Sequence, residues 1–136
     1  MDCNQSKSKD ESSDVYNDIV SIKADVGGYF SGNYEVELDF ISRRLSWRFF
    51  YVTSDKRFEK TIRQKTLNDF IDTIKNLNLM DWDSEYLDLD ICDGTQWGIE
   101  ISKKDEKIMI MGDNKFPDEW DEFCQLISRT TGKRFG

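Results

Sequence analysis

The chain has 136 residues, which is enough for one domain with a single hydrophobic core. It carries 27 acidic and 19 basic residues, a formal net charge of −8 and a sequence pI near 4.6. This balance argues against direct binding to nucleic acid or to an anionic membrane, because both need a basic face. No apolar run approaches the ~20 residues that a transmembrane helix requires.

The N-terminal stretch, residues 1–15, is polar and has few apolar side chains. Such a segment cannot bury enough surface to order itself, so we expect a disordered tail before a single domain over residues 16–136. We expect this protein to be cytoplasmic. Cys3 suggests an alternative, a membrane-anchored lipoprotein with its lipid on that cysteine, if a signal peptide has been removed.

Alternating apolar and polar residues predict three strands in the first half of the chain. These strands cover residues 19–26, 34–40 and 45–52. Residues 53–65 are expected to form a charged connector. Thr66 is a suitable N-cap for a helix whose apolar residues recur at helical spacing as far as Leu77, and Asn78 is the expected end.

The second half repeats this order of elements. Its predicted strands lie at residues 87–91, 97–101 and 108–110. Asp93-Gly94 suits a type I′ turn and predicts a hairpin between the first two of them. Phe116-Pro117 is expected to open a final helix, because proline is tolerated at the first helical position, and Gly132 is the expected stop.

The sequence therefore predicts an α+β domain with an antiparallel sheet of about six strands. The strands are expected as two β-meanders, each followed by a helix that packs on one face of the sheet, in the order βββα-βββα. The matching halves suggest an internal repeat of residues 19–78 and 85–132. Convergent amphipathic patterning accounts for the match equally well.

A set of aromatic, glycine and turn residues punctuates the second half of the chain. The set consists of Trp82, Tyr86, Asp93, Gly94, Trp97, Asn114, Phe116 and Pro117. Its order resembles a small bacterial domain family without an established function, whose members carry W-x3-Y, DGTxW and GxNxFP before a final helix. The resemblance implies a shared fold, and it carries over no catalytic residue.

The sequence contains no histidine, which excludes the usual Ser–His and Cys–His nucleophiles and the common histidine-ligated zinc sites. No glycine-rich phosphate loop is present. The acidic run from Asp81 fails the EF-hand pattern, because Tyr86 and Cys92 occupy the positions that need glycine and glutamate. We therefore predict no catalytic residue, no metal site and no cofactor.

Two further groups of residues leave alternatives open. Glu35 and Glu37 lie on one strand face, roughly 7 Å apart, which is within the range of a glycosidase carboxylate pair, although a solvated strand face explains them more simply. Cys92 and Cys124 sit among apolar neighbours and are expected to be reduced thiols or to form a disulfide.

Charge is segregated along the chain. Eight basic residues lie between Arg43 and Lys65, whereas residues 76–102 contain seven acids and no base. The two segments either neutralise each other in the fold or leave an acidic surface for a basic protein partner. The candidate partner-binding residues are Asp81, Asp83, Glu85, Asp88 and Asp90.

From this pattern we predict a non-enzymatic protein–protein interaction module of the inhibitor or immunity type. The alternatives are a lipid-anchored envelope lipoprotein with a ligand-binding role and a carboxylate-based hydrolase.

Overall fold

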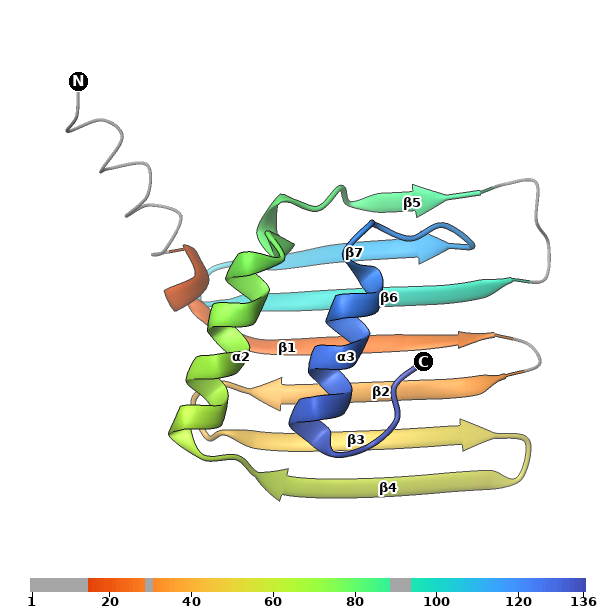
Figure 1. Cartoon of the computed structure of the whole chain (residues 1–136), viewed down its shortest axis with the longest axis horizontal. Coiled ribbons are helices and arrows are strands. Elements are labelled where there is room, and N and C mark those ends of the chain that lie inside the picture. Colours follow the sequence, from red (N-terminus) through yellow and green to blue (C-terminus); the bar gives the residue numbers. More distant parts are fainter. Residues whose placement is uncertain (1–14, 29–30, 89–93) are drawn as a thin grey trace.

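One seven-stranded sheet organises the computed structural model, which describes residues 15–28, 31–88 and 94–136 (Figure 1). The strand order is β4-β3-β2-β1-β6-β7-β5. The elements are β1 (Ile19–Gly28), β2 (Gly32–Asp39), β3 (Arg44–Tyr51), β4 (Ser54–Thr61), α2 (Gln64–Asn76), the 3-10 helix η1 (Leu79–Asp81), β5 (Glu85–Leu87), β6 (Thr95–Lys103), β7 (Lys107–Asp113) and α3 (Trp120–Thr131). The predicted α+β class with a mostly antiparallel sheet is confirmed.

The first four strands form a continuous antiparallel meander, one strand longer than the sequence predicts. The prediction of a connector over residues 53–65 is wrong, because β4 occupies most of it. β4 forms an edge of the sheet, where a strand needs no buried stripe and charged side chains discourage further pairing. Phe58 is its single large apolar residue, so no alternating pattern was available to reveal it.

The predicted hairpin between residues 87–91 and 97–101 is also wrong. β7 lies between β5 and β6, and β5 pairs with β7 in parallel. The charged turn at residues 103–107 joins β6 directly to β7, so β5 has only the outer edge of β7 left to pair with. The layout is therefore not βββα-βββα, and the two halves differ in strand number and order. Asp93, on which the hairpin prediction rested, lies outside the described residues.

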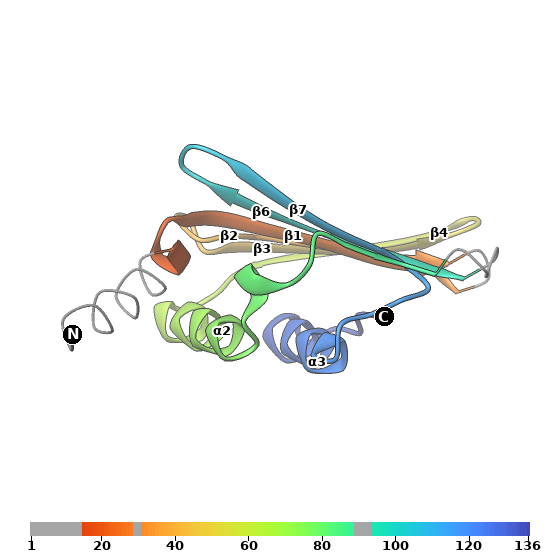
Figure 2. The ribbon, with the colours of Figure 1, turned by 90° about the horizontal axis from the view of Figure 1, so that it is seen from above.

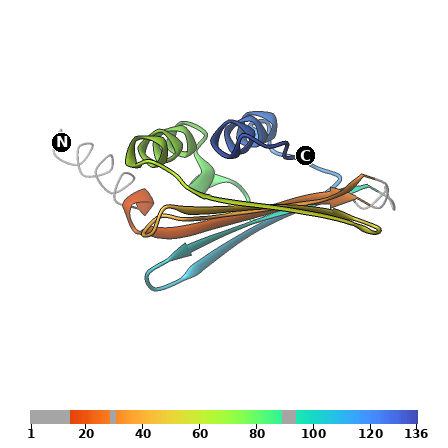
Figure 3. The same ribbon diagram turned by 90° about the horizontal axis from the view of Figure 1, so that it is seen from below.

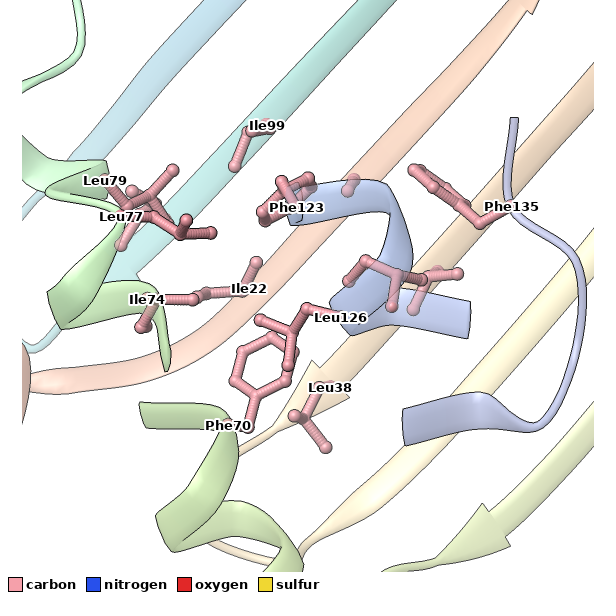
Figure 4. Packing of buried hydrophobic residues seen from close by; sticks show 14 of the residues in the cluster. Ile22, Leu38, Phe70, Ile74, Leu77, Leu79, Ile99, Phe123, Leu126 and Phe135 are labelled. Carbon is pink, nitrogen blue, oxygen red and sulfur yellow. The ribbon is translucent and has the colours of Figure 1, made fainter. Parts of the chain in front are cut away.

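Both helices cover the same face of the sheet, as predicted, and Figures 2 and 3 show the opposite face bare of any helix. The core lies between α2, α3 and the inward residues of the central strands (Figure 4). Phe70, Ile74 and Phe123 point inward from the helices and are 0–1 % exposed, as are Leu38 and Ile99 from the sheet. Burying each such side chain stabilises the fold by about 1.5–3 kcal/mol before chain entropy is subtracted.

The helix boundaries differ slightly from the prediction. α2 begins at Gln64, two residues before the expected Thr66 cap. α3 begins at Trp120, so Phe116-Pro117 forms the approach to the helix, and the Pro117 carbonyl accepts a hydrogen bond from the Trp120 N–H at 3.1 Å. Gly132 ends α3 with a left-handed φ of 74°, as predicted for a glycine cap.

The C-terminal residues return across the helix-covered face (Figure 1). The Trp47 indole Nε1 donates to the Arg134 carbonyl at 2.8 Å, and Phe135 is buried beside Tyr34. This segment closes the core above β2 and β3. No helix among the described residues is long and apolar enough to cross a membrane.

Candidate functional site

The sheet has one face without a covering layer, and we call it the open face (Figure 2). It carries the strand side chains that alternate with the buried ones. Cross-strand register places them in rows, and the central row runs over all seven strands. Its members, from β4 to β5, are Arg57, Arg48, Glu35, Asp25, Gly98, Met111 and Glu85.

An arginine-centred network occupies the β2–β4 end of the open face. The Arg48 guanidinium donates to both oxygens of Asp55 at 3.1 Å and lies 3.5 Å from a Glu35 oxygen. Its Cζ atom is 4.3 Å from the centre of the Phe50 ring. Hydrogen bonds from Arg48, and then from Arg57, lower the pKa of Asp55 to about 2. Arg48 and Arg57 are therefore paired with acids close to them.

Asp25 lies at the centre of the open face, on β1. It is opposite Glu35 on one side and Gly98 on the other, and a Cβ atom added at Gly98 would lie 3.3 Å from its Oδ2 atom. The side chain is exposed, but neighbouring sheet atoms desolvate its carboxyl group, and this effect together with the Glu35 charge raises its pKa. Within residues 15–28, 31–88 and 94–136, Asp25 forms no ion pair.

Two hollows flank this acid pair. One, of about 530 Å³, extends from Asp25 and Glu35 over Gly27 toward Asn33 and Gln96. The other, of about 420 Å³, lies on the β1–β4 side of Glu35. Asn33 covers Gly27 so closely that a Cβ atom there would lie 2.1 Å from its Oδ1 atom, so the Asn33 amide occupies the space that a side chain at position 27 would need.

Beyond Gly98 the open face becomes apolar. Met109, Met111 and Leu87 are 59 %, 54 % and 42 % exposed, and they form an apolar strip on β7 and β5. Methionine is common at adaptable binding surfaces because its side chain is flexible and polarizable. The strip therefore places exposed apolar groups next to a row of carboxylates.

The predicted partner-binding acids lie on the edge strand β5 and among the residues just before and after it. Asp81 ends η1, Asp83 follows it, Glu85 lies on β5, and Asp88 follows β5 with its N–H bonded to the Asp113 carbonyl at 3.0 Å. The first three are exposed. We call these four residues the acidic edge. Asp90 lies outside the described residues.

The acidic edge and the basic β3–β4 region are at opposite ends of the strand order. The two segments therefore do not meet, and the alternative in which they neutralise each other within the chain does not fit the fold.

The residues of the family resemblance gather around one indole ring. Trp97 has Tyr86 at 5.6 Å, Trp82 and Phe116 at 6.4 Å and Trp120 at 4.6 Å, measured between ring centroids. This aromatic cluster belongs to the core and its border.

Close contacts explain the motif residues that are not aromatic. Asn114 adopts a left-handed φ of 60°, and its side chain fills the space that a Cβ atom at Gly94 would need. Pro117 is buried at the approach to α3. The described motif residues therefore serve packing and turns, whereas Asp93 is not described.

The carboxylates considered for hydrolysis do not form an isolated pair. Glu35 contacts Arg48, and Glu37 lies opposite Ser46 and Lys23 on the open face. In the described part of the chain no group of histidine, cysteine, aspartate or glutamate is arranged to hold a metal ion. Cys124 is a free thiol whose pKa is raised to about 12, mainly by burial, while Cys92 lies outside the described residues.

Comparison with known proteins adds no identification. No family model matches the chain, and no curated protein matches it. The family resemblance therefore stays a prediction.

Sequence reasoning placed Met109 and Met111 on one strand face but did not connect them with Asp25. That connection depends on the pairing of β1 with β6 and β6 with β7, which no local pattern specifies. The one available signal was the apolar character of both faces of the strand, with Met109 and Met111 opposite Ile108 and Ile110.

Proposed function

We propose that this chain is a non-enzymatic interaction module that binds a basic protein, in the manner of an inhibitor or immunity protein. The observation that supports it is the strand order, which separates the acidic edge from the basic strands β3 and β4. Acids that are not neutralised within the fold keep a negative potential at the surface, and such a potential speeds encounter with a basic partner and selects against acidic ones.

The acids of the edge are suited to this role by their exposure. Asp81, Asp83 and Glu85 are exposed, and none of the ion pairs formed by described residues includes them. Surface carboxylates of this kind cost little to desolvate partially, and they affect association rates more than the stability of the fold. Their removal should therefore weaken binding without unfolding the chain.

The test is capture of a partner from an extract of the native cells by immobilised protein at low salt. We expect one stoichiometric basic protein, released at about 0.5 M salt because the charges are then screened. The variant Asp81→Asn/Asp83→Asn/Glu85→Gln should lose this capture.

The matched control, Asp69→Asn/Asp72→Asn/Asp105→Asn, removes the same charge from exposed positions on α2 and the β6–β7 turn and should retain capture. Equal loss in both variants would show a general charge effect. Recovery of no stoichiometric protein would contradict the proposed function.

The proposed compartment is the cytoplasm, and the alternative is a lipoprotein anchored through Cys3, which lies outside the described residues. Metabolic labelling with an alkyne fatty acid separates the two. Label on the native protein that disappears in Cys3→Ser would establish the anchor and move the search for partners to the cell envelope.

Asp25 supports the hydrolase as a second candidate, because its raised pKa beside Glu35 suits a proton donor. Turnover of a chromogenic glycoside panel that is lost in Asp25→Asn would favour this function. Failure of the whole panel would leave the acid pair as a binding feature.

A further inference from the structure

We infer that the open face binds a basic amphipathic helix that lies along β6, with its cationic side on the β1–β2 carboxylates and its apolar side on the apolar strip. This inference rests on the proposed function and extends its partner surface beyond the acidic edge. The occupant follows from the order of side chains across the sheet, in which the carboxylates of β1 and β2 and the exposed apolar groups of β7 and β5 lie on opposite sides of β6.

Spacing supports a helix as the occupant. Asp25 on β1 and Met111 on β7 are both register neighbours of Gly98 on β6, so they stand two strand spacings apart, or about 10 Å. An α-helix with its side chains is about 10–12 Å wide. Gly98 has no side chain to hold such a helix away from the sheet.

Charge on the carboxylate side favours a cationic ligand. Asp25 and Glu35 are direct cross-strand neighbours, and like charges so placed repel. Arg48 contacts Glu35 but is shared with Asp55, while Asp25 forms no ion pair among the described residues and is offset only by the more distant charge of Lys23 on the same strand. A lysine or arginine from the partner would supply the charge that the open face lacks at this point.

The apolar strip provides the other half of the contact. Met109 and Met111 point away from the core, on the side of β7 opposite Ile108 and Ile110. Exposed apolar groups gathered on one surface indicate an interaction site, and flexible methionines adapt to different apolar partners. Glu85 lies beside Met111 and joins this surface to the acidic edge.

The test is an NMR titration of the ¹⁵N-labelled chain with a synthetic lysine–leucine amphipathic peptide of about 18 residues, long enough to form a helix on binding. We expect saturable binding with shifts concentrated at Asp25, Gly98, Met109 and Met111. A glutamate–leucine peptide of the same pattern and a lysine–serine peptide should not bind, because each lacks one of the two required faces.

Variants separate the open face from the rest of the surface. Met109→Lys/Met111→Lys should weaken binding of the lysine–leucine peptide by about tenfold or more, through loss of apolar contact and like-charge repulsion. Ile41→Lys makes the same kind of change at an exposed turn residue that lines neither hollow and should leave affinity unchanged. Asp25→Asn/Glu35→Gln should weaken binding most at low salt.

Each other result has a definite meaning. Shifts confined to the acidic edge, or full affinity in the methionine variant, would overturn this inference while leaving the proposed function intact. Concentration-dependent self-association that the methionine variant abolishes would also overturn it, because a second copy of the chain would then cover the strip. Loss of partner capture by the acidic-edge variant, measured separately, tests the proposed function itself.

Discussion

Gly112 lies on β7 directly against the indole ring of Trp97, and this contact makes a strong prediction. A Cβ atom at Gly112 would lie 2.0 Å from the Trp97 Nε1 atom and 2.2 Å from Cε2, far inside normal contact. The indole cannot retreat easily, because Trp82, Tyr86 and Trp120 surround it and its Nε1 donates to the Lys115 carbonyl at 2.9 Å. Gly112→Ala should therefore force a displacement inside the aromatic cluster.

The expected cost combines two terms. Overpacking a well-packed site typically destabilises a protein by about 1–3 kcal/mol. Tilting the indole also weakens the hydrogen bond from Trp97 to Lys115, which contributes about 0.5–1.5 kcal/mol. Gly112 does not have a positive φ, so backbone strain adds nothing further. We expect Gly112→Ala to lower the free energy of unfolding by about 2–4 kcal/mol.

Urea unfolding followed by tryptophan fluorescence measures this loss, with the slope m as the check that unfolding remains cooperative. Gly98→Ala is the matched control, because it is also a strand glycine in this sheet but its Cβ atom would meet only the flexible end of Asp25 at 3.3 Å. It should cost much less than Gly112→Ala.

A double-mutant cycle with Trp97→Phe tests the cause, since phenylalanine lacks the atoms that the new methyl group would strike. An equal cost of Gly112→Ala in both backgrounds would refute the reasoning.

Three further outcomes are expected. Gly132→Ala should cost about 1 kcal/mol in urea unfolding, because its φ of 74° disfavours a side chain although nothing lies within 4 Å. Folding lowers the pKa of Asp55 to about 2, so its charged carboxylate stabilises the chain at pH 7 and Asp55→Asn removes that stabilisation. The difference in free energy of unfolding between the chain and this variant should disappear as the pH falls from about 4 through 2. Folding raises the pKa of Asp25, so its charged carboxylate is less favourable in the folded state and Asp25→Asn should not lower the free energy of unfolding at pH 7. Any stabilisation by Asp25→Asn should disappear in acid melts at pH values below the ordinary aspartate pKa, where the carboxyl is protonated in both the folded and the unfolded chain.

Local patterns in the sequence predicted much of this fold correctly. The first three strands, both helices and the covering of one face follow from alternation and helical spacing, because burial on one side produces those periods directly. Gly132 was identified as a helix end for a conformational reason that the structure bears out.

The wrong predictions for β4 and β5 arose because their places in the sheet depend on pairing with strands elsewhere in the chain. β4 lacks a buried stripe because it is an edge strand, and its charged residues are typical of a loop as well. β5 pairs with β7 across a stretch that contains all of β6, and a turn motif such as Asp93-Gly94 does not report on such a crossing.

The candidate site was the least predictable part. The central row joins one residue from each of the seven strands, from Arg57 on β4 to Glu85 on β5, and a shift of one residue in any pairing would disperse it. The acids of the edge were visible in the sequence as a run of like charge. Their separation from the basic strands was not, since it follows from strand order alone.

The one-sided architecture has a consequence for how such a protein can evolve. Structural integrity resides in the helix-covered layer, whereas substitutions at exposed positions usually change stability by no more than about 0.5 kcal/mol. Residues on the bare side, such as Lys23, Glu37 and Met109, can therefore vary almost independently of the scaffold. For the proposed interaction module, this separation would let specificity change on a constant framework.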